Sequence, residues 1–355
     1  MKTLHFDARF IRLDHHDGIS RFSVELIKHL TSKVRVVAII HDRKQLNLLP
    51  KGIEFLEANS PESLAEFFIA KKLNRAGATH VYSPMQVMGS AGRKYRLALT
   101  LHDLIYYRHR RPPQDLNLFI RVIWRLYHLT YIPQRILLNR ADEVVTVSET
   151  SKKLIEKHHL TRKPVSVIYN SSSVGFKSGS RTFPKEINLV YIGSFMPYKN
   201  VETLIRATGK SSNTTLHLLS KITPDRELAL SELAKTWEAK VVFHRGVTDE
   251  QYLTALNSAF ALVTASKDEG FGIPLVEAMS QATPVIVSDL EIFREVAGEA
   301  GNYFKPDDPD TLVKKITYLK EKQTWEANSK AALEQAKKFS WESSAKKLLE
   351  VLASK

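Results

Sequence analysis

Glu269 and Glu277 stand on either side of a glycine-rich turn in the stretch SKDEGFGIPLVEAMSQATPVIVSD, residues 266–289. Gly270 and Gly272 let the backbone approach a ligand closely, and the free N–H groups of a helix beginning near Pro274 attract an anion. Carboxylates accept hydrogen bonds from neighbouring hydroxyl groups. A diphosphate flanked by two sugars would use both features. A capped helix with solvated acids explains the glycines and the proline equally well, so residue types alone leave both interpretations open.

Short β-branched runs alternate with amphipathic segments along most of the chain, a pattern typical of βα units and parallel sheets. In the first half we predict strands within 3–8, 34–40, 79–83, 96–101, 142–147 and 165–169, and helices near 19–31, 62–75, 115–140 and 149–159. In the second half we predict strands within 187–193, 214–219, 239–244, 260–265 and 283–288, and helices near 200–209, 225–237, 249–258, 274–281, 310–321 and 325–339. A last helix begins near 341.

A polar break rich in glycine and serine, residues 170–186, separates the two halves and is predicted to be the interdomain linker. The chain is therefore expected to be an α/β protein of two Rossmann-like, doubly wound domains, 1–183 and 184–340, facing a central cleft. The closing helix, 341–355, is expected to cross back to the first domain. Ligands of such sheets bind beyond the carboxyl ends of the strands.

The charge of the chain is concentrated in its first half. Residues 1–183 hold 30 lysines and arginines against 15 acids, whereas residues 184–355 hold 22 against 23. A basic half indicates nucleic acid, anionic lipid or an acidic substrate as a partner. The chain has no cysteine, no apolar run long enough to span a membrane, and an N-terminus unlike a signal peptide, so we expect a cytoplasmic protein.

The stretch EGFGIPLVEAM resembles the E-x7-E signature of the retaining GT-B glycosyltransferases of family 4, also called group 1. The resemblance extends over nearly the whole chain. In the second half it rests on YIGSFMPYKNVETLIRA, FHRGVTDEQYLTAL and FSWESSAKKLLEVL, and in the first half on LTLHDL and ADEVVTVSETSKKLI. It implies the GT-B fold, with residues 1–183 binding the acceptor and residues 184–340 binding a nucleotide sugar.

The resemblance also implies roles for individual residues. Glu277 would bind ribose hydroxyls, Glu269 would hold hydroxyls of the transferred sugar, Lys199 would grip the diphosphate, and His102 would lie near the sugar and the acceptor. The remaining positions implied in donor binding are Gly18, Gly193, Ser194, Gly270, Phe271 and Gly272. Ser194 stands where many relatives carry arginine, which leaves one cation fewer for the diphosphate.

The reaction implied is transfer of a hexose with retention at the anomeric carbon, without a covalent nucleophile and without a metal or other cofactor. The P-x-K-N segment favours mannose from GDP-mannose, transferred to a glycan or lipid-linked acceptor of the cell envelope. Asp308 and Asp310 spell a D-x-D, but they precede a helix, where Asp310 is expected to be an N-cap rather than a metal ligand. The alternatives are a sugar-nucleotide epimerase of the same fold and a non-catalytic partner subunit.

Residues 106–140 mix basic with aromatic and aliphatic residues. The arginines are Arg108, Arg110, Arg111, Arg121, Arg125, Arg135 and Arg140, and the aromatic residues among them include Phe119, Trp124, Tyr127 and Tyr131. This composition suits a helix lying on an anionic membrane, which would make the enzyme peripheral on the inner face. An ordinary helix packed on the sheet is the alternative. No nucleic-acid-reading motif accompanies the charge, so no nucleic acid partner is expected.

Overall fold

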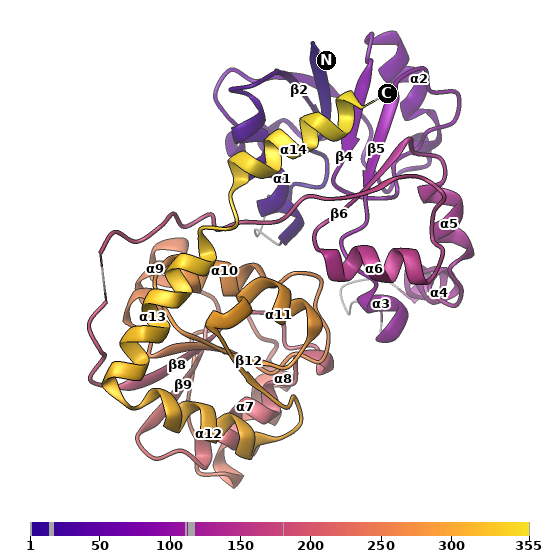
Figure 1. Cartoon of the computed structure of the whole chain (residues 1–355). Helices are drawn as coiled ribbons and strands as arrows, with labels where there is room; N and C mark the ends of the chain where they lie inside the picture. Colours follow the sequence, from indigo (N-terminus) through magenta and orange to yellow (C-terminus); the bar gives the residue numbers. More distant parts are fainter. Residues whose placement is uncertain (1, 14–17, 111, 113–117, 180, 355) are drawn as a thin grey trace. The chain divides into compact units, whose positions relative to one another are not determined.

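The computed structural model describes residues 2–13, 18–110, 112, 118–179 and 181–354. The chain forms two compact units, one made of residues 1–170 and 340–355 and the other of residues 171–339. Each unit is an α/β domain built on a parallel sheet (Figure 1).

Unit 1 contains a seven-stranded parallel sheet in the order β3-β2-β1-β4-β5-β6-β7. The strands are β1 Thr3–Asp7, β2 Arg35–Ile40, β3 Glu54–Glu57, β4 His80–Ser83, β5 Arg96–Thr100, β6 Glu143–Thr146 and β7 Val165–Val167. The helices are α1 Gly18–Leu30, α2 Ile69–Arg75, α3 Ile105–Arg108, α4 Leu118–Tyr127, α5 Ile132–Leu138, α6 Glu149–Lys157 and α14 Trp341–Ala353, with 3-10 turns η1 Arg43–Leu48 and η2 Leu64–Phe68. Strand order reverses between β1 and β4.

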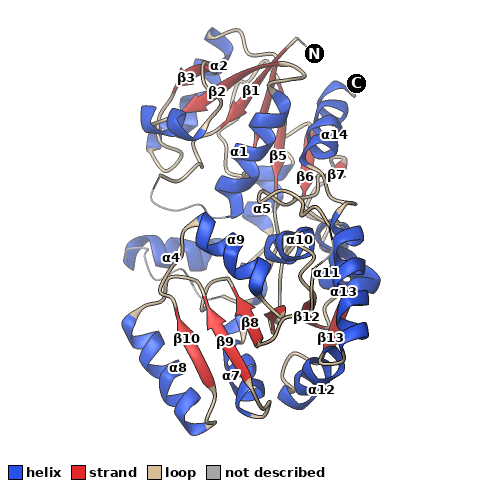
Figure 2. Cartoon of the chain, turned by 90° about the vertical axis from the view of Figure 1, so that its left-hand side faces the viewer, coloured by secondary structure: helices blue, strands red, loops and turns tan. Residues whose placement is uncertain are grey.

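Unit 2 contains a six-stranded parallel sheet in the order β10-β9-β8-β11-β12-β13 (Figure 2). The strands are β8 Ile187–Tyr191, β9 Thr214–Leu218, β10 Lys240–Phe243, β11 Ala261–Thr264, β12 Val285–Ser288 and β13 Gly301–Phe304. The helices are α7 Val201–Gly209, α8 Pro224–Thr236, α9 Asp249–Ser258, α10 Ile273–Ser280, α11 Glu291–Ala297, α12 Pro309–Leu319 and α13 Lys322–Ala336, with 3-10 turns η3 Pro197–Lys199 and η4 Gly298–Ala300. Strand order reverses between β8 and β11, and the loops after these two strands carry the predicted site.

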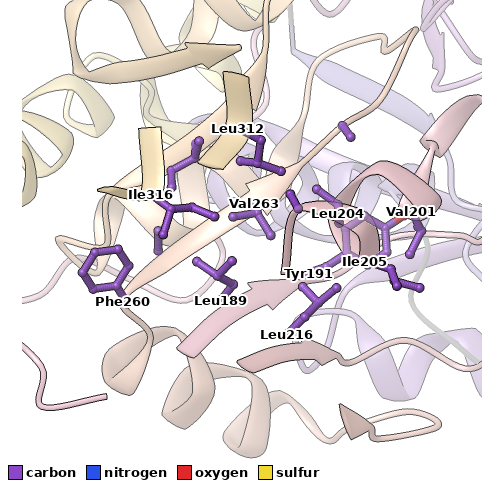
Figure 3. Close-up of a cluster of buried hydrophobic side chains, with 14 of the residues drawn as sticks. Leu189, Tyr191, Val201, Leu204, Ile205, Leu216, Phe260, Val263, Leu312 and Ile316 are labelled. Carbon is purple, nitrogen blue, oxygen red and sulfur yellow. The ribbon is translucent and has the colours of Figure 1, made fainter. Parts of the chain in front are cut away.

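The packing in the core of unit 2 explains why its central strands are continuous apolar runs in the sequence. Leu189 and Val263, from the two central strands, pack against Leu204 of α7 and Ile316 of α12, all with 1% or less of their surface exposed (Figure 3). Helices cover a parallel sheet on both faces, so both faces of its central strands must be apolar.

The C-terminal helix α14 belongs to unit 1, where it packs against α1 (Figure 1). The ring of Trp341 stands edge-on to that of Phe22, with 5.9 Å between centroids. The Oγ of Ser340 accepts a hydrogen bond from the N–H of Ser343 and caps the helix start.

The boundary between the units falls before Ser171 rather than at residue 183. Ser172, Lys177 and Arg181 of the predicted linker bond to unit 2: Ser172 Oγ lies 2.9 Å from Ser280 Oγ, the Lys177 N–H donates to the Ser280 carbonyl, and Arg181 donates to Thr283 Oγ1 at 2.7 Å. A polar composition therefore does not show that this segment is a free linker, because these three of its polar residues form hydrogen bonds within unit 2.

The predicted elements differ from the observed ones in several respects. Strands β3 and β13 and helices α3 and α11 were not predicted, because they are short, and β3 is a polar edge strand of sequence EFLE. The helix predicted at 115–140 is two helices, α4 and α5, with Pro133 in the first turn of α5. Arg111 lies outside the described residues.

Candidate functional site

The central contact of the unit 2 site joins the loop after β8 to the loop after β11. The ammonium of Lys199 donates a hydrogen bond to Glu269, whose Oε1 also accepts from Ser266 Oγ at 3.1 Å. The Lys199 and Glu269 side chains keep 14% and 16% of their surface exposed, so both can still be reached by a ligand. The residues predicted to contact the diphosphate and the sugar are thus direct neighbours.

The glycine turn before α10 has the geometry that its sequence predicts. Gly272 is the N-cap, with φ 93° and ψ 56°, a backbone conformation that side chains disfavour. Ile273 is the first helical residue and Pro274 lies in the first turn. Phe271 is buried, its ring edge-on to Phe339 at 5.5 Å, and this contact anchors the turn. The N–H groups of the helix start therefore stand beside the Glu269 loop.

Glu277 lies within α10 and is only 1% exposed. Its Oε1 accepts from Ser173 Oγ and its Oε2 from the Tyr252 hydroxyl, each at 2.9 Å. Both carboxylate oxygens therefore already accept a hydrogen bond within unit 2. Ser173 and Tyr252 were not predicted; they come from the segment before β8 and from α9, and no local motif links them to Glu277.

The loop after β8 is shaped by Gly193 and Tyr191. The Gly193 N–H donates to Ser220 Oγ at 2.9 Å, and the Tyr191 hydroxyl donates to the Ser194 carbonyl at 2.6 Å. Burial, together with the nearby negative charge of Glu269, raises the pKa of Tyr191 well above its ordinary value. The phenol therefore stays protonated and holds the loop as a hydrogen-bond donor.

Ser194 is exposed, and a cation that the sequence analysis missed, Arg226 of α8, contacts this loop. Its Nε donates to the Phe195 carbonyl at 3.2 Å and its Nη2 to Glu202 at 2.6 Å. Arg226 thus brings positive charge to the loop in which Ser194 stands. Its position could be found only from the fold, because α8 follows the next strand of the sheet.

In unit 1, His102 follows β5 and packs against the first helix. Its Nε2 donates to the Pro84 carbonyl at 2.8 Å, since a carbonyl can only accept, and its ring stands edge-on to Phe22 of α1 at 5.3 Å. Gly18 is the first residue of α1 and is exposed. A cavity of about 120 Å³ adjoins His102, with Ile19, Asp103, Tyr106, Tyr107, His128 and Gln134 among its lining residues.

The loop that leads from β1 toward Gly18 is held by a buried charge network. Arg9 Nε donates to Asp7 Oδ1 at 2.8 Å and its Nη1 to Glu66 Oε2 at 2.6 Å. The Gln45 amide donates to three carbonyls of the same loop, those of residues 8, 9 and 11. Burial disfavours the Arg9 charge, but the two carboxylates raise its pKa. Residues 14–17 of the glycine loop lie outside the described residues.

The D-x-D of residues 308–310 caps a helix, but through Asp308 rather than Asp310. Asp308 Oδ1 accepts from the N–H groups of Asp310 and Thr311, while Asp310 pairs with Lys210. Pro309 is the first helical residue, so the N-cap lies one position before it. Within the described ranges, no group of three or more histidine, aspartate or glutamate side chains is arranged to hold a metal.

The two parallel sheets, each with its strand-order reversal, define the GT-B class of proteins, and solved structures of that class match the chain over its length. Sucrose-phosphate synthase from Thermosynechococcus elongatus superposes with a TM-score of 0.75 at 18% identity, covering 99% of this chain and 98% of that one. Anabaena HepE in complex with UDP and glucose gives 0.74 at 19% identity, covering both chains completely.

Residues 176–339 match the family model for glycosyl transferases group 1, and residues 16–171 match the model for glycosyltransferase family 4. The O-antigen chain mannosyltransferase B of Escherichia coli is 32% identical over 92% of this chain and 93% of its own length. The O-antigen chain mannosyltransferase RfbU of Salmonella typhimurium is 28% identical over 82% and 84%. The chain belongs to the family 4, or group 1, glycosyltransferases.

Proposed function

We propose that this glycosyltransferase transfers mannose from GDP-mannose, with retention, to a glycan or lipid-linked acceptor of a cell-envelope polysaccharide. The names of its relatives, O-antigen chain mannosyltransferases, support the sugar and the product class. The observation that carries the proposal is the hydrogen bond from Lys199 to Glu269, which lies in the loop that leads into α10.

In the donor complex, Lys199 and the N–H groups of α10 bind the diphosphate, and they stabilise its negative charge as the sugar departs. Glu269 binds sugar hydroxyls and turns the anomeric carbon toward the acceptor. We assign this carboxylate the role of a positioning group and not that of a nucleophile. The acceptor hydroxyl attacks from the face that the diphosphate leaves, its proton passes to a leaving phosphate oxygen, and the configuration is retained.

Glu277 binds ribose hydroxyls, because a carboxylate accepts hydrogen bonds from neighbouring hydroxyl groups. On the acceptor side, the cavity beside His102 receives the sugar that is extended, and His102 forms its wall. Lys199 and the helix N-terminus supply the charge that a divalent ion would otherwise supply. Transfer is therefore expected to persist in EDTA, and its loss there, restored by added Mg²⁺ or Mn²⁺, would contradict this part of the proposal.

The test of the donor site is calorimetric titration with GDP, UDP and ADP. We expect GDP to bind best, and Glu277→Ala to weaken it by about 1–3 kcal/mol through lost ribose hydrogen bonds. Glu277→Gln is the variant that keeps the shape of the buried side chain, and Glu250→Ala, on the exposed surface of α9, is the control. If none of the three nucleotides binds to the wild type, the donor site is assigned wrongly.

Product analysis by NMR tests the reaction. An α-linked mannoside from α-configured GDP-mannose means retention, and a β-linked product would overturn the mechanism. Conversion of the donor to another sugar nucleotide without an acceptor would indicate an epimerase. Binding without turnover on any envelope acceptor would indicate a non-catalytic partner subunit.

A further inference from the structure

Two histidines lie side by side on one face of the unit 2 sheet, where strands β8, β9 and β10 are neighbours (Figure 2). Leu216 and Leu218 of β9 belong to the core, so His217 between them lies on the opposite face. His217 is in register with Val242 of β10, which is 36% exposed, and His244 follows two positions later on the same face. We call His217 and His244 the histidine pair.

The hydrogen bonds around the histidine pair fix which ring nitrogens carry protons. The Glu186 carboxylate accepts from the Asn188 amide nitrogen at 2.9 Å, so Asn188 Oδ1 is the atom that faces Nε2 of His217, at 3.3 Å. Because an amide oxygen only accepts, His217 carries its proton on Nε2 and keeps a lone pair on Nδ1. Nε2 of His244 lies 3.1 Å from that Nδ1 and donates to it.

The surroundings of His217 are those of a metal-binding histidine. Such a histidine usually donates its other ring N–H to an acceptor, which fixes the tautomer and the orientation of the ring. Asn188 accepts this bond, and Glu186 in turn holds Asn188. Burial, His244 and Lys240 lower the pKa of His217, and Glu186 opposes this shift only in part. The Nδ1 lone pair is therefore present near neutral pH.

The spacing of the two facing nitrogens fits a shared ion. Zinc binds imidazole nitrogen at about 2.0–2.1 Å, so two nitrogens on one tetrahedral ion lie about 3.3 Å apart. His217 Nδ1 and His244 Nε2 are 3.1 Å apart, and the two rings are inclined by 38°. For an ion to bind, His244 transfers its proton from Nε2 to Nδ1 by way of water. His244 is exposed, so its ring can turn the freed lone pair toward the ion.

We propose that the histidine pair binds a divalent transition-metal ion of the zinc type, through Nδ1 of His217 and Nε2 of His244, with water in the remaining positions. Imidazole favours zinc, nickel and copper, whereas magnesium and calcium favour oxygen ligands. A hollow of about 850 Å³, whose lining includes Asn188, His217 and Lys240, leaves room for the water ligands.

The histidine pair is separate from the donor site. Lys199, Glu269 and Glu277 are not among the described residues that line the hollow beside His217. The ion would instead join β9 to the residue that follows β10, the edge strand of the sheet, and so stabilise unit 2. The inference therefore does not depend on the proposed function, and sugar transfer is not expected to need this ion.

The test is calorimetric titration of the full chain with Zn²⁺. His217→Gln and His244→Gln should each weaken Zn²⁺ binding by about a hundredfold, and Asn188→Ala by about tenfold, since it removes only the group that orients His217. Zn²⁺ should also raise the unfolding temperature of wild type but not that of the two histidine variants. The control is His41→Gln, an exposed histidine of unit 1, which should bind Zn²⁺ like wild type.

Nitrogen NMR of the histidine rings identifies the ligands directly. One equivalent of Zn²⁺ should shift Nδ1 of His217 and Nε2 of His244, and in metal-free Asn188→Ala the ring of His217 should populate both tautomers. Three results would overturn the proposal: Zn²⁺ binding as tight in His217→Gln/His244→Gln as in wild type, an equal loss in His41→Gln, or Mg²⁺ bound as tightly as Zn²⁺. Equal unfolding temperatures without metal show that the variants are folded.

Discussion

The ammonium of Lys199 donates a hydrogen bond to Oε1 of Glu269, 70 residues further along the chain. The cation that we propose binds the diphosphate and the carboxylate that we propose binds the sugar therefore neutralise one another in this structure. In the donor complex that we propose, the two groups separate, because the diphosphate binds the ammonium and the sugar binds the carboxylate. This arrangement makes the two residues behave differently on substitution.

Glu269→Gln should separate nucleotide binding from transfer. Loss of the carboxylate releases Lys199, so GDP is expected to bind as tightly as to wild type or a few-fold tighter. Transfer should fall by roughly tenfold to a hundredfold, because a bond between the sugar and a charged group is lost. Calorimetry and a rate assay on the same sample make the comparison, and weaker GDP binding would contradict it.

Lys199→Ala should weaken GDP binding and transfer together. Loss of a charged partner of the diphosphate is expected to cost about 1.5–3 kcal/mol, while Lys199→Arg restores most of the affinity. Because the pair is largely buried, removal of the ammonium leaves the Glu269 carboxylate without its cation, so we also expect the free energy of unfolding to fall by about 1–3 kcal/mol. Equal GDP affinity in Lys199→Ala and wild type would remove Lys199 from the site.

Tyr252→Phe removes a hydrogen bond that positions the Glu277 carboxylate, and it should therefore weaken the binding of Glu277 to the ribose. We expect GDP affinity to fall by about 0.5–1.5 kcal/mol, and the preference for GDP over its dideoxyribose analogue to narrow. The preference is the decisive measurement, because a purely structural loss would weaken both nucleotides equally. Tyr318→Phe, on the exposed surface of α12, is the matched control and should change neither value.

Gly272→Ala should destabilise unit 2 and displace the start of α10. A β-carbon there would lie 3.1 Å from Phe293 Cε1 at a φ of 93°, so we expect a loss of about 1–3 kcal/mol in the free energy of unfolding. Gly175→Ala separates crowding from backbone conformation, because Gly175 has φ 76° and open space around it. An equal loss in both variants would mean that the Phe293 contact is unimportant.

Unit 1 should lose stability as the pH falls below about 6.5, the ordinary pKa of histidine. Burial lowers the pKa of His128, although its hydrogen bond with the Trp124 carbonyl opposes the shift. Below pH 6.5, His128 binds a proton in the unfolded chain but not yet in the folded chain. The free energy of unfolding therefore declines until the pH reaches the folded-state pKa of His128.

The direct measurement is an NMR titration of the His128 ring, with a midpoint expected below 6.5. His5, His80, His158 and His217 also have lowered pKa values, so unfolding has to be compared between wild type and His128→Gln. The variant should lose less stability between neutral and mildly acidic pH. The exposed His41→Gln serves as the control and should behave like wild type.

Much of the fold could be predicted because local patterns encode it. Buried strands such as β8 and β11 are short apolar runs. The turn at Gly272 and the helix start near Pro274 are indicated by the types of neighbouring residues in the sequence. The strands that escaped prediction, β3 and β13, lack such runs. The segment 115–140 was predicted to be helical as a whole, but it divides into α4 and α5, because proline fits the first turn of a new helix as well as it interrupts an old one.

The sequence by itself determined which residues could bind a diphosphate and hydroxyl groups, since residue type and local turn geometry set that chemistry. The tertiary structure alone decided which groups meet. Lys199 reaches Glu269 because the sheet brings the loops after β8 and β11 to one edge. Ser173 and Tyr252 reach Glu277 because the segment before β8 and helix α9 both lie beside α10. It also decided which apolar side chains of α4 are left outside, because exposure depends on the packing of the whole unit.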